Sequence, residues 1–407
     1  MPRRSAIIAQ SCSALKNGNV SNLRRHIKSA HSTVNIDEDN AIHDKVEEVD
    51  NSGTLNLNLN NRNEPSTSQV TSQTVPQVTS QSSQIRNIRY KGIFKKRTRE
   101  KNDGCAIYFR ENKFNLKEHS FVEYFQPNVN LLNRDNIGIV VRLALRNLPD
   151  KTIVVATTHL LYNPKRHDIK LAQMQILLAE IDRIAYKSTD ESGKAIYFPI
   201  ILTGDFNLKP YTIVHDLIMN GFVKKSWNCY CQAPHKYSSM THLPYTKLLP
   251  FRLGITDSCQ HYNVIQNRNS IQREISDFKF VKLYNSERKS QSTMYNNHDW
   301  RRLCLDYNKF DSCWLHHDLN FGSVYSYDKD GINDVTTFQS EWCTVDYIFY
   351  GPLKKVDELK IDGDLKLLSY LKLPNVSQAN ILRVIPNEVC SSDHLPLLAT
   401  FHLPIDV

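Results

Sequence analysis

The chain of 407 residues carries 51 Lys and Arg against 42 Asp and Glu, a formal net charge of +9, and 40% of its residues are hydrophobic. This length suits one large domain with a tail, and the low hydrophobic fraction requires a long polar segment. No run of about 18 apolar residues exists, which excludes a transmembrane helix, and nine irregularly spaced cysteines favour a reducing compartment, so we expect a cytoplasmic or nuclear protein.

Residues 1–33 form a short basic segment. His26 and His31 have the H-x₄-H spacing of a zinc finger, and the segment resembles the second half of a BED-type finger, a DNA-binding module. A complete finger needs two upstream cysteines, whereas only Cys12 is present. We therefore expect a solvated basic helix and no zinc-dependent DNA binding.

Residues 34–85 are predicted to be a disordered linker. Between positions 66 and 84, 15 of 19 residues are Ser, Thr or Gln, and positions 51–62 are rich in Asn. Such a composition cannot bury enough apolar surface to offset the entropy of the chain.

Residues 86–407 contain the apolar, strand-like runs that are expected of a folded domain. One amphipathic helix is predicted from Asp168 to Ile184, because its apolar residues recur at helical spacing. A strand precedes it and another follows, which predicts an α/β core with helices packed on a sheet. The polar stretch 267–300 has no clean period and is predicted to be a surface insertion. The predicted strands are Cys105–Phe109, Ile137–Leu145, Ile153–Thr158, Pro199–Leu202, Val345–Tyr350 and Leu397–Phe401.

Four short polar motifs lie at the ends of predicted strands. Thr-Thr-His-Leu contains His159, and Gly-Asp-Phe-Asn contains Asp205 and Asn207. Val-Asp-Tyr-Ile begins a strand with Asp346, and Ser-Asp-His-Leu-Pro supplies Asp393 and His394. Singly, each motif is more often a turn, a cap or a buried polar residue. Because ligands gather where strands end in loops, the four together predict one converging site.

The residue types of these motifs suit hydrolysis of a phosphodiester. Asp and Asn oxygens are the ligands that Mg²⁺ prefers, and bound Mg²⁺ lowers the pKa of an attacking water. A His can donate to the negative charge that develops on phosphorus, and a partner carboxylate would hold that His in one tautomer.

The four motifs, in this order, resemble those of the endonuclease/exonuclease/phosphatase superfamily. The resemblance covers residues 86–407 and is greatest to the angel branch, relatives of nocturnin and the deadenylases. It rests further on the segments Lys91–Arg97, Asp103–Phe109 and Thr157–Asp182, the last of which includes Tyr-Asn-Pro-Lys-Arg and Lys-Leu-Ala-Gln.

The resemblance implies a four-layer α/β sandwich and Mg²⁺-dependent hydrolysis at phosphorus, usually on RNA. By motif position, Asp205 and Asn207 would hold the metal and the attacking water, and Asp393 would be a further metal ligand. His394 would contact the scissile phosphate, Asp346 would orient His394, and His159 would lie on the phosphate side.

Two motifs of the superfamily do not occur here: a first strand that carries an Asn, and a second strand that ends in Gln-Glu, whose Glu is the principal Mg²⁺ ligand. We therefore expect a domain that is incomplete at its N-terminal side, with weakened metal binding and impaired turnover.

Two functions remain open. The first is an RNA-directed Mg²⁺ hydrolase: a nuclease of the 3'–5' exoribonuclease or deadenylase kind, or an enzyme that processes RNA terminal phosphates. The second is a catalytically inactive relative that binds RNA or protein. In either case we expect RNA, in particular mRNA, as the partner, and no membrane association.

Overall fold

The computed structural model describes residues 89–224, 248–268, 314–325, 334–356 and 359–404, together with the backbone of three short strands nearer the N-terminus. Its centre is a six-stranded mixed sheet with the strand order β14-β17-β11-β8-β7-β6. The bounds of these strands are β6 Phe114–Glu123, β7 Ile137–Leu145, β8 Leu148–His159, β11 Ile200–Asp205, β14 Gly322–Ser323 and β17 Asp346–Gly351.

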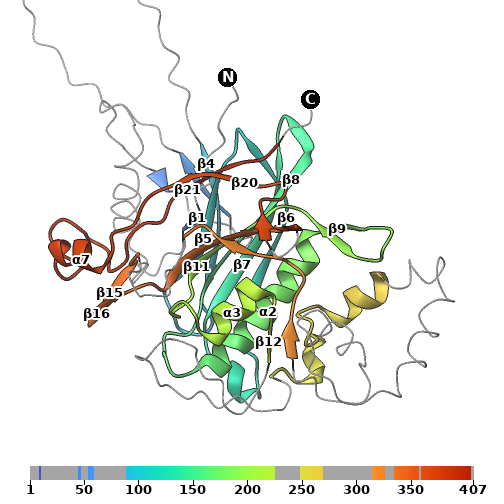
Figure 1. Ribbon diagram of the computed structural model, residues 1–407, viewed down its shortest axis with the longest axis horizontal. Coiled ribbons are helices and arrows are strands. Elements are labelled where there is room, and N and C mark those ends of the chain that lie inside the picture. The colour runs from blue at the N-terminus through green and yellow to red at the C-terminus, as the bar shows by residue number, and fades with distance from the viewer. Residues whose placement is uncertain are drawn as a thin grey trace, which may run out of the picture.

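The helix α2 (His167–Ala185) connects β8 to β11, which pair in parallel, so the predicted strand–helix–strand unit is confirmed. The other four pairings of this sheet, β14 with β17, β17 with β11, β8 with β7 and β7 with β6, are antiparallel. Each predicted strand run lies on an observed strand, with ends that shift by a few residues. Figure 1 shows α2 and the shorter helix α3 (Ile213–Asn220) lying together in front of the sheet.

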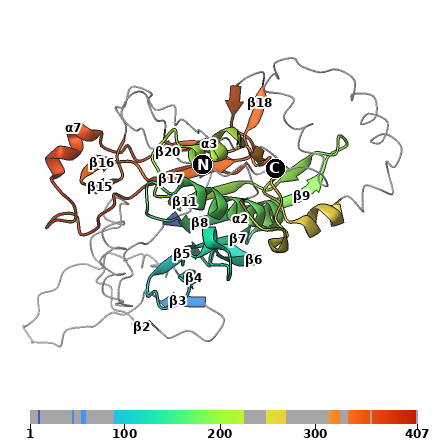
Figure 2. The same cartoon turned by 90° about the horizontal axis from the view of Figure 1, so that it is seen from below.

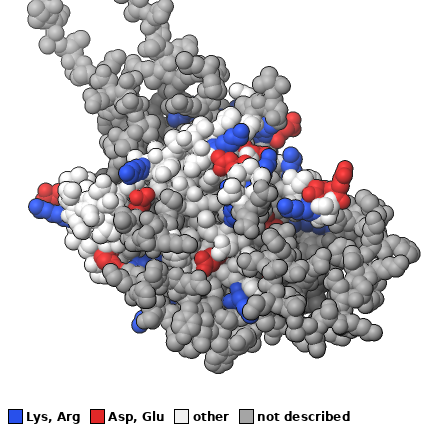
Figure 3. Space-filling view, in the orientation of Figure 1, with Lys and Arg blue, Asp and Glu red and all other residues white. Residues whose placement is uncertain are grey.

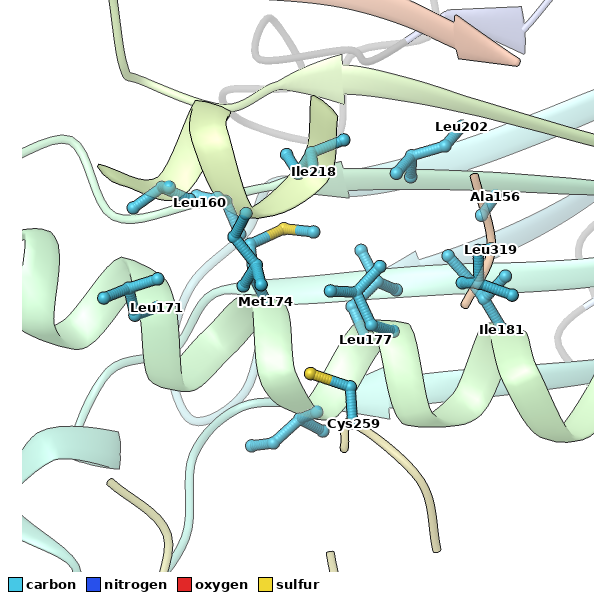
Figure 4. Packing of buried hydrophobic residues seen from close by; sticks show 14 of the residues in the cluster. Ala156, Leu160, Leu171, Met174, Leu177, Ile181, Leu202, Ile218, Cys259 and Leu319 are labelled. Atoms are coloured by element: carbon cyan, nitrogen blue, oxygen red, sulfur yellow. The ribbon is translucent and has the colours of Figure 1, made fainter. Parts of the chain in front are cut away.

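Alternation along the strands divides the hydrophobic residues between the two faces of this sheet. In β8, Val154 and Ala156 face the helices, whereas Ile153 and Val155 face the opposite side. The helix-side core contains residues from α2, α3 and the strands, and Figure 4 shows Leu177 and its neighbours on α2 projecting toward the sheet. The α2 side chains in this core are apolar, because the packed space between the helix and the sheet excludes the water that would solvate polar groups.

The opposite face of the central sheet is covered by a second set of strands. β4 (Tyr90–Lys96) and β5 (Gly104–Arg110) pair with each other, and β20 (Lys366–Tyr370) pairs with β21 (Ala399–His402). Residues of β4, β5 and β21 join the second core together with alternate residues of the central strands. The described residues therefore form three layers, with helices, the central sheet and outer strands in that order.

Three short strands lie upstream of position 86, in the stretches expected to be a basic segment and a linker. β1 (Ala9–Gln10) pairs with β5, and β3 (Thr54–Asn58) pairs with β4 and with β2 (Lys45–Val46). β2 and β3 lie within residues 34–85, most of which lie outside the described residues, so the linker stays a prediction. The alternating Thr-Leu-Asn-Leu-Asn of β3 suits a strand, and the edge of β4 offers unpaired backbone groups. His26, His31 and most of the insertion 267–300 lie outside the described residues.

An arm projects from one side of the molecule in both Figure 1 and Figure 2 and contains β15 (Thr337–Gln339), β16 (Glu341–Cys343) and α7 (Val376–Ala379). None of the helices in the described part of the chain is long and apolar enough to cross a membrane. The remaining elements are η1 Asn130–Leu132, β9 Tyr186–Thr189, β10 Ala195–Tyr197, β12 Phe222–Lys224, η2 Phe251–Leu253, β13 Trp314–His316, β18 Lys354–Val356, β19 Leu359–Ile361 and η3 Asn380–Leu382.

The packing of α2 on the sheet predicts a large stability loss for Leu177→Ala. Leu177 has no exposed surface, so truncation removes buried methyl groups and leaves a cavity, at a cost of about 2–5 kcal/mol. Leu359→Ala is the control, because Leu359 is 71% exposed and its truncation should change stability by less than about 0.5 kcal/mol. Urea unfolding of both variants measures the difference, and equal effects would contradict the packing described here.

Candidate active site

Strand register brings three of the predicted residues to one edge of the central sheet. Asp205 ends β11 and lies opposite His159 of β8 in the parallel pairing and opposite Asp346 of β17 in the antiparallel pairing. Neighbouring strands are about 4.8 Å apart, so the three residues are direct cross-strand neighbours. The motifs that lie far apart in the sequence therefore meet because their strands are adjacent.

The turn after β11 depends on two unusual backbone conformations. Gly204 has φ of +145°, and a Cβ at this position would lie 2.1 Å from the carbonyl oxygen of Thr158. Asn207 has φ of +51°, in the left-handed region that Asn tolerates better than most residues. The backbone amide of Asn207 donates to Asp205 Oδ1 at 2.9 Å, and its side-chain Nδ2 donates to the carbonyl of Leu160 at 3.0 Å. Asn207 thus ties the β11 turn to the chain that follows His159.

His394 reaches this edge from an irregular segment that two threonines support. His394 forms an isolated antiparallel bridge with Thr337, whose hydroxyl donates to the carbonyl of Asp393 at 2.6 Å. The hydroxyl of Thr336 accepts the backbone amides of Val345 and Asp346, at 3.0 and 3.2 Å. Adjacent threonines therefore hold the start of β17 and the His394 segment in one arrangement.

The side chains form a compact charged cluster. His394 Nδ1 lies 2.7 Å from Asp346 Oδ2, and the other ring nitrogen, Nε2, lies 3.9 Å from Asp205 Oδ2. His159 Nε2 lies 3.5 Å from the same oxygen of Asp205. Asp205 and Asp346 are 3% and 7% exposed, so both carboxyl groups are largely removed from water.

Burial and neighbouring charges shift two pKa values in this cluster. Burial raises the pKa of Asp205, and the adjacent Asp346 raises it further, against the opposing influence of His159 and His394. Burial lowers the pKa of His394, but the charge of Asp346 and its hydrogen bond outweigh burial and raise that pKa to about 9. His394 is therefore a cation at neutral pH, with Nδ1–H donating to Asp346 and Nε2–H directed toward Asp205.

The other two predicted metal ligands, Asp393 and Asn207, have different surroundings. Asp393 is exposed, and the described His, Cys, Asp and Glu side chains whose ligand atoms all lie within 4.8 Å of one another are Asp205, Asp346 and His394. Asn207 contributes its backbone amide and its Nδ2 to the turn described above. Asp205 is the residue common to the predicted ligands and to the group that the structure brings together.

The cluster fits a divalent cation in its donor chemistry. Two buried carboxyl groups lie close together; burial and then the charge of Asp346 raise the pKa of Asp205, and a cation would offset both effects. Carboxylate oxygens suit a hard ion such as Mg²⁺ or Mn²⁺. Asp205 would hold such an ion, with Asp346 as the nearest second carboxylate.

Sequence reasoning missed the residues that support this cluster. Thr336 and Thr337 lie outside the four motifs, and nothing in their local pattern marks them. Lys170 and Gln173 lie within the Lys-Leu-Ala-Gln segment of α2, yet both are fully buried, and Lys170 Nζ donates to the backbone carbonyl of Asn207. Gln173 and Gln175 stand in the same stretch of α2, so the lysine alone did not mark the site.

Comparison with known proteins gives the same family as the motifs. Protein angel homolog 2 of Homo sapiens is 34% identical over 334 residues, which cover 79% of this chain and 57% of that protein. Protein angel homolog 1 of Homo sapiens is 33% identical over 361 residues, which cover 79% of this chain and 53% of that protein. The chain thus spans a little over half the length of these curated relatives. No family model matches the chain.

A solved structure agrees in both fold and sequence. The crystal structure of ANGEL2, a 2',3'-cyclic phosphatase, in complex with adenosine-2',3'-vanadate matches at a TM-score of 0.55 and 32% identity, over 77% of this chain and 74% of that one. The chain belongs to the endonuclease/exonuclease/phosphatase superfamily, in its angel branch. The predicted α/β fold of this superfamily is therefore confirmed, and the described residues form three of its four expected layers.

The electrostatics of the cluster predict that Asp346→Asn lowers the pKa of His394 from about 9 toward its ordinary value of about 6.5. The variant removes the negative charge that raises this pKa, whereas burial, which lowers it, remains. In the wild type the folded-state pKa is the higher one. The stability that the charged His394 contributes is therefore full below about pH 6.5 and is lost as the pH rises to about 9. Asp346→Asn should abolish this loss.

NMR titration of the imidazole protons in metal-free protein measures the pKa, and urea unfolding at pH 6.5 and pH 9 measures the stability change. His317 is the internal control, because burial lowers its pKa to about 4 and its ring bonds the carbonyl of Leu217 instead. An unchanged His394 titration in the variant would show that Asp346 is not the cause of the raised pKa.

Proposed function

We propose that the chain is an angel-like, Mg²⁺-dependent phosphodiesterase that acts on the 3' ends of RNA. The observation that carries this proposal is the arrangement of the His394–Asp346 pair across from Asp205, with 3.9 Å between His394 Nε2 and Asp205 Oδ2. A hydrogen-bond donor and a carboxylate that face the same small space are what a phosphate and its attacking water require.

His394 is proposed to bind the phosphate. As an imidazolium its Nε2–H donates to a phosphate oxygen, where negative charge grows as water attacks phosphorus. Asp346 holds the ring through Nδ1 and favours its charged form, so His394 is aligned before the substrate arrives. His159, next to Asp205, is placed to contact the same phosphate from the β8 side.

Asp205 is proposed to orient the attacking water and accept its proton. Its raised pKa brings a carboxylate closer to neutral pH, where it becomes a more effective base. The amide of Asn207 occupies Oδ1 of Asp205 and leaves Oδ2 directed toward the two histidines. When bound, Mg²⁺ would supply charge stabilisation at the phosphate and a lower pKa for the water.

Among substrates, we favour a 2',3'-cyclic phosphate at the end of RNA over a poly(A) tail. The relative solved with adenosine-2',3'-vanadate is described as a 2',3'-cyclic phosphatase, and it shares 32% identity with this chain. On the face that Figure 3 shows, Lys and Arg side chains of the described residues are interspersed with Asp and Glu.

A matched set of RNA oligonucleotides tests the proposal. The oligonucleotides share one sequence and end in a 2',3'-cyclic phosphate, a 3'-phosphate, or a 3'-hydroxyl after an A-tract. We expect Mg²⁺-dependent opening of the cyclic phosphate, with slower or no shortening of the A-tract. Shortening of the A-tract alone would favour the exoribonuclease function. Binding of all three without turnover, at any Mg²⁺ concentration, would favour the inactive RNA-binding relative.

The proposed roles predict that Asp205→Ala and His394→Ala each lower kcat by about 10²–10⁴-fold, the range for loss of a positioned acid or base. Asp362→Asn is the matched control. Asp362 is a half-buried carboxyl that accepts a hydrogen bond from the hydroxyl of Tyr350 at 2.8 Å. Tyr350 lies near the last residue of β17, whereas Asp346 is the first residue of that strand. Its variant should retain activity, and equal losses in all three variants would indicate unfolding rather than chemistry.

A further inference from the structure

Lys170 is a lysine in a place where the helix needs an apolar side chain. It lies on α2 between Ile169 and Leu171 and has no exposed surface, like both of these neighbours. An ammonium group with its long stem loses both solvation and rotamer freedom when it is buried so completely. Packing alone therefore gives no reason for a lysine here, and the reason must lie in the groups that it contacts.

Those contacts belong to the turn that carries Asp205. Lys170 Nζ donates to the backbone carbonyl of Asn207, and the charge of Asp205 is close enough to interact favourably with it. The amide of Asn207 in turn donates to Asp205 Oδ1 at 2.9 Å. The backbone of Asn207, through its carbonyl and its amide, thus connects the buried ammonium group on α2 to the carboxylate at the centre of the candidate active site.

Gln173, nearly one helical turn further along α2, supports the neighbouring loop in the same way. Its Oε1 accepts the backbone amide of Leu161 at 3.0 Å, and its Nε2 lies 3.4 Å from Asn136 Oδ1. Leu161 follows His159 by two positions, so this contact holds the chain that leaves β8. Residues at i and i+3 of a helix share a face, and here that face contacts both loops.

We propose that Lys170 is a positioning residue, which holds the Asp205–Asn207 turn in its left-handed conformation and places a compensating positive charge beneath Asp205. The turn needs such support because Asn207 has positive φ and Asp205 is buried. The effect on the turn is independent of the reaction, whereas the effect on turnover rests on the proposed function.

The test variant is Lys170→Met, which keeps the length and burial of the side chain and removes its charge and donor. Gln175→Met is the matched control: Gln175 is 1% exposed on the same helix, and its Nε2 donates to the carbonyl of Thr256 at 2.8 Å, on another segment. Both variants lose one hydrogen bond of a buried α2 side chain, but only Lys170→Met loses one to the turn.

Three measurements follow on the full chain. Hydrogen exchange of the Asn207 amide should become about tenfold faster in Lys170→Met and stay unchanged in Gln175→Met. The affinity for Mn²⁺, measured by electron paramagnetic resonance, should change in Lys170→Met alone, because this variant loosens the turn of Asp205 and removes a positive charge beside it. On the cyclic-phosphate oligonucleotide, kcat should fall by about 10–100-fold with little change in KM, the effect of a misplaced reacting group. Lys170→Arg, which retains a charged donor, should recover part of each effect.

The outcomes separate this proposal from the proposed function. Faster exchange and altered Mn²⁺ binding in a chain that hydrolyses no RNA would support the positioning role and reject the proposed function. Unchanged exchange and Mn²⁺ affinity in Lys170→Met would overturn the positioning role, even if the wild type is active. Equal changes in Lys170→Met and Gln175→Met would also overturn it, since they would reflect a general loosening of α2.

Discussion

The register of β11 between β8 and β17 is the constraint on which the site depends. Asp205 can face both His159 and Asp346 only while the parallel pairing on one side and the antiparallel pairing on the other are both in place. A slip of one residue on either side would turn the partner's side chain to the helix face of the sheet. The two hydrophobic cores prevent that slip, because alternate residues of these same strands fill both.

This arrangement gathers several charged side chains in a buried site. The energetic cost of burying them is reduced because negative and positive groups are neighbours. Two carboxyl groups, Asp205 and Asp346, have His394 between them and Lys170 beneath the turn. A buried charge is costly unless it is paired and hydrogen-bonded, and each member of this set has a partner of opposite sign within the set. Burial lowers the pKa of Lys170 to about 8 despite the opposing charge of Asp205, which shows that the compensation is incomplete.

The sequence was informative wherever a local pattern decided the structure. The continuous apolar run of β7 marked its exact bounds, and helical spacing located α2 to within one residue at each end. β6 escaped prediction because four consecutive polar residues, Lys117–Ser120, and a register shift between Leu116 and Glu118 break the alternation that would mark a strand. α3, with eight residues, was too short to show a period.

The same distinction applies to the site. His159, Asp205, Asp346 and His394 could be predicted because functional residues at strand ends interrupt apolar runs, and that interruption is visible in one dimension. The residues that support the site could not be predicted from the sequence. Thr336 acts by accepting the amides that begin β17, ten residues away, and Lys170 acts on a carbonyl 37 residues away. Such contacts depend on which elements become neighbours, and a single sequence contains no pattern that specifies them.

The two halves of the site differ in how firmly they are held. Asp205 and His159 lie on strands that have partners on both sides within the central sheet. His394 lies on an irregular segment whose backbone contacts Thr336 and Thr337, at the start of β15 outside the central sheet, and its ring bonds Asp346 of β17. Local opening begins where few backbone hydrogen bonds must break, so the His394 segment should separate before the central strands do. The charged hydrogen bond between His394 and Asp346 therefore has a structural role as well as a chemical one, because it closes the segment onto the strand that completes the site.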